Sequence, residues 1–294
     1  MSATAPPTPP AAAGAAGPRL RPITGPSALG GDARRFVHLA TTLAINEFKL
    51  RFFGSALGYV WQLMRPLLLF GVLYLVFTEF VRLGGGVEFY PVVLLTNIVL
   101  FTFFLEGTGG AVTSVVDREA LVRKIQFPRM AIPVSVVLTA SFNLGLNGLV
   151  VLIFALANGV TPRWTWLEAI PLVAILAVLT TGTAMLLSSL YVRYRDVRPI
   201  WDVFSQALFY ATPVIYTIDA LDKADWIKHL IMLNPIAAIL EQMRHAVIDP
   251  NAPTAAQAAG GAGRLLLSGA IVVLVAGFGF WRFNRDAPRI AEDL

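Results

Sequence analysis

Long apolar runs alternate with short polar segments along most of this chain. Runs long enough to cross a membrane occupy residues 62–82, 91–116, 131–157, 168–191, 201–219 and 264–283. A bilayer core of roughly 30 Å needs about 20 residues of α-helix. The pattern therefore predicts an all-α integral membrane protein with six transmembrane helices. Pro213 interrupts the fifth run and predicts a kink there.

The segment before the first run has a different pattern. In residues 34–60, Ala40, Ala44 and Phe48 recur at helical spacing with polar residues on another face. This spacing favours an amphipathic helix lying in the membrane interface, and an ordinary packed helix is the alternative. Residues 1–33 are rich in Ala, Pro and Gly and predict a disordered cytoplasmic tail.

The stretch between runs five and six is long for a loop. Residues 226–233 and 235–247 are apolar but too short to span a membrane. They predict short outer re-entrant helices, which dip into the membrane and return under cover of protein or water. The six-helix domain is then expected over residues 61–285, followed by a cytoplasmic C-terminal tail over 286–294.

Composition and charge sharpen this picture. Hydrophobic residues make up 56% of the chain and charged residues 14%, against about 25% charged in an ordinary soluble domain. Of the 23 Lys and Arg, seventeen fall on the side that holds both termini, which predicts cytoplasmic termini in a multi-pass protein. The basic balance is thus explained without nucleic acid. The chain has no cysteine, which excludes disulfides and thiol chemistry.

Five motifs follow one another in a fixed relation to the predicted spans. They lie at residues 49–61, 121–129, 191–197, 212–216 and 234–235, and read KLRFFGSALGYVW, LVRKIQFPR, YVRYRDV, TPVIY and NP. Together they resemble the membrane subunit of ABC-2 type exporters, in particular the O-antigen, teichoic acid and cell-wall galactan export permeases. The resemblance covers roughly residues 34–285.

This resemblance implies a permease of the bacterial inner membrane. It implies a homodimer that binds two copies of a separate ATP-binding subunit and encloses a passage for a polyprenyl-diphosphate-linked glycan. The sequence agrees, since it contains no G-x-x-x-x-G-K-[ST] phosphate loop. We therefore expect no cofactor in this chain, with ATP and magnesium held by the partner.

The connection between spans two and three is the candidate ATPase-coupling segment. In the family this connection resembles the helix that docks into the ATP-binding partner, and a short rigid element tied to two spans suits that task. The alternative is an ordinary basic loop that obeys the positive-inside rule. The candidate coupling residues are Asp117, Arg118, Glu119, Leu121, Arg123 and Lys124.

A second cytoplasmic group follows span four. Arg193, Arg195 and Asp196 resemble a second partner contact or an entry site for the diphosphate, to which we add Arg51. Arginine binds phosphate in a bidentate way that lysine does not. Orientation anchors, with Asp196 paired to an arginine, are the equal alternative.

Aromatic residues are frequent in spans two and five. Sugar rings pack their C–H faces on aromatic rings, so a passage lined by them lets a glycan slide without one tight site. Lipid-facing or packed aromatics are the alternative for any single residue. The candidate channel-lining residues are Phe101, Phe104, Phe209, Tyr210 and Tyr216.

Other function classes fit less well. The three histidines show no metal spacing and no paired nucleophile, so we assign no catalytic and no metal site. A glycolipid-processing enzyme would need a cluster of acidic or basic groups at one interface. An ion-coupled transporter often shows two related halves. An ABC-2 exporter of a drug or small lipid is the nearest alternative.

Overall fold

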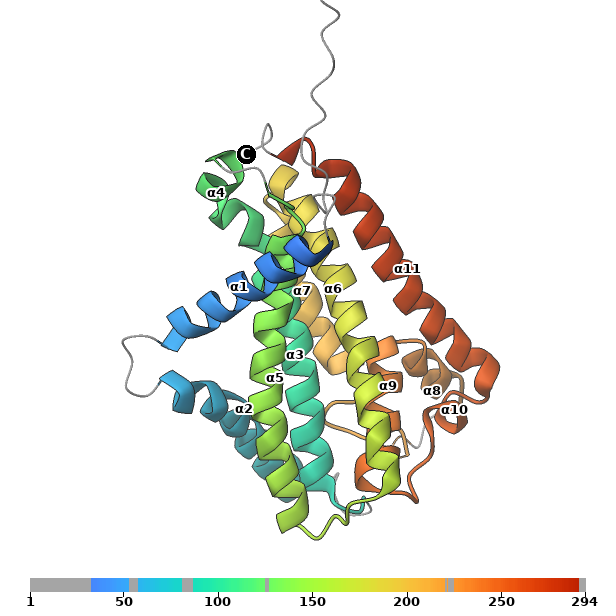
Figure 1. Cartoon of the computed structure of the whole chain (residues 1–294). Coiled ribbons are helices and arrows are strands. Elements are labelled where there is room, and N and C mark those ends of the chain that lie inside the picture. The colour runs from blue at the N-terminus through green and yellow to red at the C-terminus, as the bar shows by residue number, and fades with distance from the viewer. Residues whose placement is uncertain are drawn as a thin grey trace, which may run out of the picture.

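The computed structural model describes residues 33–52, 58–80, 87–124, 127–219, 221 and 225–290, and all regular structure in this part is helical (Figure 1). The α-helices are α1 (Ala33–Phe52), α2 (Gly58–Leu75), α3 (Tyr90–Asp117), α4 (Glu119–Lys124), α5 (Ala131–Ala157), α6 (Ala169–Arg193), α7 (Val197–Ala211), α8 (Asp225–Met232), α9 (Pro235–Met243), α10 (Ala255–Ala258) and α11 (Ala262–Asp286). Three short π or 3-10 segments are η1 (Val76–Phe80), η2 (Trp164–Glu168) and η3 (Arg244–Ile248). The predicted all-α membrane class is confirmed.

Five described helices are long and apolar enough to cross a membrane, and they match predicted runs one to four and six. They are Val60–Thr78, Tyr90–Asp117, Ala131–Ala157, Trp164–Arg193 and Ala262–Asp286. The fifth predicted run is divided into the 15-residue α7 and an irregular segment over residues 212–219. Thr212, which precedes Pro213, is extended, the conformation that a residue before proline favours. The count of six spans is therefore not confirmed.

Helix α3 forms the centre of the bundle. It packs against α5 and α6, and 78% of its most apolar stretch is buried. Leu94, Ile98 and Phe101 are among its fully buried side chains. A Cβ at Gly107 would lie 2.5 Å from Cγ2 of Thr180 in α6, so the missing side chain lets the two helices approach closely.

Helix α11 is joined to the bundle mainly through α6. At their crossing, a Cβ at Gly182 would lie 2.5 Å from Cα of Ala276, and a Cβ at Gly279 would overlap the carbonyl of Gly182. Small residues at such crossings let helices gain dispersion contacts that lipid would not replace. These two glycines therefore fix the position of α11.

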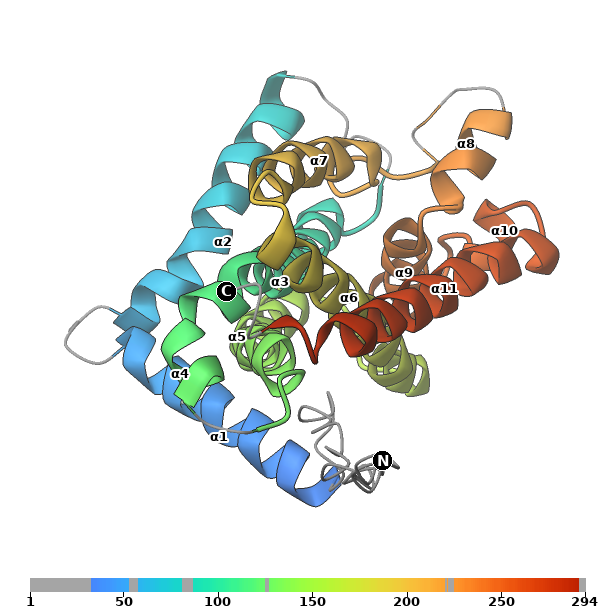
Figure 2. The same ribbon diagram turned by 90° about the horizontal axis from the view of Figure 1, so that it is seen from above.

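Helices α1 and α2 lie at the edge of the molecule. Helix α1 crosses α5 (Figure 1) and buries Ala40 and Ala44 of its predicted apolar face, while Val37, three residues before Ala40, is exposed. Helix α2 packs on the bundle with one side, which includes Phe70 and Tyr74, and only 6% of the residues in its apolar stretch are fully buried. Figure 2 shows α2 and α7 on one side of the bundle and α11 on the other.

The short helices α8, α9 and α10 lie beside the first half of α11 (Figure 2). They share a small core that includes Ile218, Met232 and Ala237. Helix α9 begins after Asn234, whose Oδ1 accepts a hydrogen bond from the amide of Ile236 at 3.0 Å, as an N-cap residue does. The predicted short helices are thus present, and their entry into the membrane stays a prediction.

Candidate functional site

The candidate coupling segment projects from one end of the bundle (Figure 1). Helix α3 ends at Asp117, whose carboxylate accepts a hydrogen bond from Thr113 at 2.6 Å. Arg118 turns back to α1 and forms an ion pair with Glu47 at 2.5 Å. The structure therefore gives Arg118 a partner within the chain, and it ties the coupling segment directly to α1.

Helix α4 packs on an apolar cluster. Val122 is buried against Phe127, Met130 and Phe283, and Leu121 packs partly on the same cluster. Arg129 donates a hydrogen bond to the carbonyl of Ala287, just after α11. The segment is thus connected to α5 and α11 as well as to α3. Glu119 is half-buried, and the side chains of Arg123 and Lys124 lie outside the described residues.

The basic group after α6 is exposed at the same end of the bundle (Figure 1). Arg193, Arg195 and Asp196 are all exposed, and the guanidinium of Arg195 lies 5.1 Å from the ring centre of Tyr191. Stacking on a ring leaves the guanidinium N–H groups available for phosphate oxygens. The side chain of Arg51 lies outside the described residues, so its predicted place beside this group stays a prediction.

The predicted aromatic residues come together where α3 meets α7. Ring centres of Phe101 and Phe209 are 5.3 Å apart, and Phe104 lies 6.1 Å from Trp201. Phe101 and Phe104 are buried, so within one chain they hold α7 against α3 and face no open space. Trp201 was missed in the sequence, although its spacing of three from Phe204 places both on one helix face.

The uncovered face of α7 carries both aromatic and polar groups. Phe204 and Tyr210 are 54% and 63% exposed, and Asp202 and Gln206 of the same helix are exposed as well. Tyr216 is half-buried, and its hydroxyl donates to the carbonyl of Tyr210 at 3.4 Å. Of the five predicted channel residues, Tyr210 is thus the one that is exposed on this face.

The irregular segment after α7 is held by side chains from other helices. Asn97 of α3 donates to the carbonyls of Pro213 and Val214 at 3.2 and 3.3 Å. Tyr90 donates to the carbonyl of Ile215 at 2.8 Å. Irregular backbone is tolerated at membrane depth when protein groups satisfy it. These hydrogen bonds explain how the TPVIY motif can keep a non-helical backbone inside a helical bundle.

A buried charge cluster lies around Arg244, in η3 between α9 and α10. Arg244 forms ion pairs with Asp219 at 2.9 Å, Glu241 at 3.1 Å and Asp249 at 3.8 Å. Burial raises the pKa of the Glu241 carboxyl to about 7, against the opposing effect of Arg244. Loss of the arginine would leave buried carboxylates without their cation, which is costly. Arg244 therefore fixes the return of the chain towards α11.

A second polar cluster ties α2 to the bundle. Glu106 of α3 accepts hydrogen bonds from Gln62 of α2 at 3.0 Å and from Asn143 of α5 at 2.8 Å. Charged groups are costly within a membrane unless polar partners surround them. Glu106 therefore joins α3 to both α2 and α5.

Comparisons with known proteins agree with this architecture. The model of the ABC-2 type transporter family matches residues 38–248. An O-antigen export system permease protein of Klebsiella pneumoniae is 29% identical over 208 residues, which cover 70% of this chain and 78% of that protein. A protein of the same description from Myxococcus xanthus is 27% identical over 217 residues, covering 74% and 83%. The chain belongs to the ABC-2 type transporter family.

Proposed function

We propose that this chain is the membrane permease subunit of an ABC transporter that exports a polyprenyl-diphosphate-linked polysaccharide across the bacterial inner membrane. ATP and magnesium are bound and hydrolysed by two copies of a separate subunit. The similarity to O-antigen export permeases supports the substrate class. The observation that carries the proposal is the broad uncovered surface of α7, which exposes the aromatic residues Phe204 and Tyr210 and the polar residues Asp202 and Gln206.

The proposal includes a sixth span. Helix α7 has 15 residues, which rise about 22 Å. The irregular residues 212–216 continue beyond its end, so that the two together are proposed to cross the bilayer core of roughly 30 Å. With six spans, both termini, α4 and the basic group after α6 lie in the cytoplasm. The short helices α8 to α10 then lie towards the outer face, as the re-entrant helices of the sequence prediction would.

The proposal also includes a second copy of the chain. Helices α2 and α7 leave apolar and aromatic faces uncovered on one side of the bundle (Figure 2). Two copies that meet through this side enclose a passage lined by aromatic rings and polar groups. Rings pack on the C–H faces of sugars, and the polar groups replace water at the hydroxyls. The ATP-binding subunits dock at α4, where Arg123 and Lys124 supply positive charge.

A pair of matched variants tests the function in cells. Phe204 is 54% exposed and lies 5.5 Å from Trp201, whereas Phe278 of α11 is 52% exposed and lies 5.7 Å from Trp281. In a strain without the native gene, Phe204→Ala should lower surface glycan and raise lipid-linked glycan inside the cell. Phe278→Ala should restore export fully. Equal export by both variants would contradict a passage along α7.

Docking of the partner is tested separately. Charge reversal of Arg123 and Lys124 to Glu should leave membrane insertion intact and abolish co-purification of the ATP-binding subunit. The same reversal at Arg285 and Arg289, which are exposed near the C-terminus, should leave co-purification unchanged. Undiminished co-purification in the first variant would contradict the coupling role of α4.

A further inference from the structure

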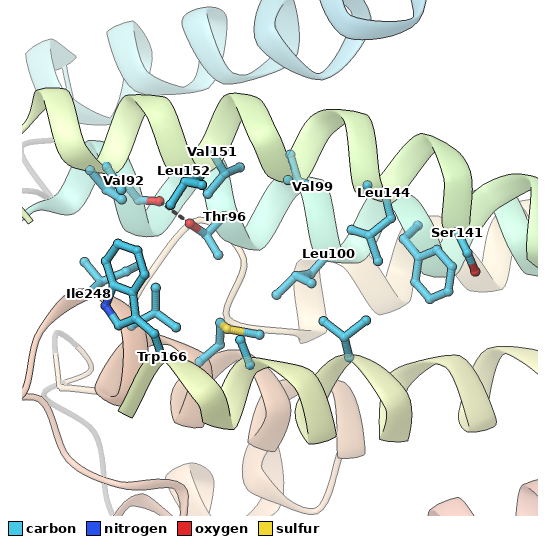
Figure 3. A pocket seen from close by; sticks show the side chains of 18 of the residues that line it. Val92, Thr96, Val99, Leu100, Ser141, Leu144, Val151, Leu152, Trp166 and Ile248 are labelled. Atoms are coloured by element: carbon cyan, nitrogen blue, oxygen red, sulfur yellow. Dashed lines mark hydrogen bonds between the residues drawn. The ribbon is translucent and has the colours of Figure 1, made fainter. Parts of the chain in front are cut away.

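A deep apolar groove lies between α5 and α6, with α3 as its floor (Figure 3). Its volume is about 440 Å³, which is within the range of sites that hold small organic ligands. Leu152 and Gly145 at its rim are exposed, so the groove opens to the surface of the molecule. None of the proposed transport or coupling residues lines it.

The groove has the depth of one membrane leaflet. Along α3 it runs from Val92 to Phe103, and on the other side it reaches from Trp166 in η2 to Ala177 in α6. Eleven helical steps rise about 16 Å, which is about half of a bilayer core of roughly 30 Å. Along α5 the lining extends from Ser141 to Ala155, fourteen helical steps or about 21 Å. Most of it belongs to the half of the bundle that contains the connection between α5 and α6. Most of the groove therefore faces the hydrocarbon of a single leaflet.

The interior of the groove suits hydrocarbon. The hydroxyl of Thr96 donates to the carbonyl of Val92 at 2.7 Å (Figure 3), and that of Ser141 donates to the carbonyl of Val137 at 2.9 Å. Both hydroxyls thus donate to carbonyls of their own helices and need no hydrogen-bond acceptor in the groove. Leu144, Val151 and other apolar side chains form the remaining walls.

One end of the groove is different, because unpaired donors gather there. Trp166 and Ile248 lie at this end (Figure 3). Within the described part of the chain, the buried Nε1 of Trp166 and the buried Nε of Arg163 have no hydrogen-bond partner. Arg163 is held next to the groove, because its Nη2 donates to the carbonyl of Ile248 at 3.2 Å. Buried donors without a partner are costly, so this end is built for an acceptor that the chain itself does not supply.

We propose that this groove binds one glycerophospholipid of the leaflet at the α5–α6 connection. One acyl chain fills the apolar groove, and the phosphate or ester oxygens accept hydrogen bonds from Nε of Arg163 and Nε1 of Trp166. The positive charge of Arg163 favours an anionic phosphate. A polyprenyl chain is much longer than one leaflet, and a helix of a second copy would not satisfy the two donors. The proposal rests on the membrane-spanning fold and is independent of the exported substrate.

Two glycines allow the groove to be filled without disturbing the bundle. Gly145 and Gly148 line it, and a Cβ at either position would meet no atom within 4 Å. A leucine at either site therefore projects into the groove and displaces the acyl chain. Gly277 of α11 provides the control, since a Cβ there also meets nothing and this residue lies outside the groove.

Native mass spectrometry of the full-length chain tests the proposal, with phosphatidylglycerol added to delipidated protein as the probe. The wild type and Gly277→Leu should each retain one phosphatidylglycerol per chain. Gly148→Leu and Gly145→Leu should lower the affinity at least about tenfold, which corresponds to roughly 1.4 kcal/mol. Arg163→Gln should lower it for phosphatidylglycerol more than for uncharged diacylglycerol.

Thermal unfolding in the same detergent is the second readout. Added phosphatidylglycerol should raise the Tm of the wild type and of Gly277→Leu, because a ligand that binds only the folded state stabilises it. It should leave the Tm of Gly148→Leu unchanged. Equal lipid retention by the glycine variants would overturn the proposal. So would co-purification of a polyprenyl lipid in the same stoichiometry, or loss of a dimer on filling the groove.

Discussion

Helices α2 and α3 have the same mean hydropathy of 1.7 over their most apolar stretches, yet their surroundings are opposite. In α3, 78% of that stretch is buried within the chain, and in α2 only 6% is. Hydropathy reports that a segment enters the membrane, because lipid and protein interior are both apolar. It does not report which of the two surrounds the helix. We interpret the exposed side of α2 as a surface left for a second copy and for lipid.

The largest loss of stability is expected at the crossing of α6 and α11. Gly279→Leu places a side chain against the backbone of Gly182, where a Cβ already overlaps the carbonyl. We expect a loss of more than about 3 kcal/mol in the free energy of unfolding, because the backbone must move. Detergent or thermal unfolding of the purified chain measures it. Gly277→Leu, two residues away in open space, should be close to wild type, and equal losses would refute the packing argument.

A cavity in α3 should be nearly as costly. Phe101 is fully buried against Phe209 and Phe104, so Phe101→Ala should cost about 3 kcal/mol of unfolding free energy. Leu68 of α2 is exposed, and Leu68→Ala should change stability by less than about 0.5 kcal/mol. A comparable loss in both variants, measured by unfolding of the isolated chain, would show that α2 is covered as well as α3.

A smaller effect is expected where α2 is anchored. Gln62→Leu removes the hydrogen bond from α2 to Glu106, and we expect a loss of about 1 kcal/mol. Gln206→Leu on the exposed face of α7 is the matched control and should be close to neutral for unfolding. Proteolysis within the α2–α3 connection should also become faster in Gln62→Leu alone. If the two glutamine variants had the same unfolding free energy, the hydrogen bond from Gln62 would not anchor α2.

The smallest effect concerns the ion pair between Arg118 and Glu47. Both side chains are about one quarter exposed, so a double-mutant cycle with Arg118→Gln and Glu47→Gln should give at most about 1 kcal/mol. Raising the salt concentration should reduce it further. A coupling energy that is large and insensitive to salt would mean that α1 and the α3–α4 connection are far more tightly joined than the geometry indicates.

The sequence predicted the spanning helices well where one long run forms one helix. It failed at residues 201–219, because the apolar run continues through Pro213 while the backbone does not. The stabilising partners of the irregular segment, Asn97 and Tyr90, come from more than a hundred residues earlier in the chain. No local pattern connects them, so only the folded structure could show that the segment is satisfied.

The roles of the candidate site residues stay predictions, but the structure shows how these residues are packed. The exposed basic group after α6 and the aromatic character of α7 followed from composition at span ends. Sequence could not show that Phe101 and Phe104 are buried between α3 and α7, since an aromatic residue in a span packs equally well on lipid or protein. Nor could it show that Arg118 pairs with Glu47, because that pairing depends on how α1 crosses the bundle.

The central claim is that this chain provides the passage while a separate subunit provides the energy. It is tested most directly in vesicles that contain the purified chain, its ATP-binding partner and a lipid-linked glycan in one leaflet. We predict that ATP drives the glycan to the other leaflet only when both proteins are present, and that Phe204→Ala slows this movement while Phe278→Ala does not. Hydrolysis of ATP by the chain alone, or glycan movement without the partner, would contradict the claim.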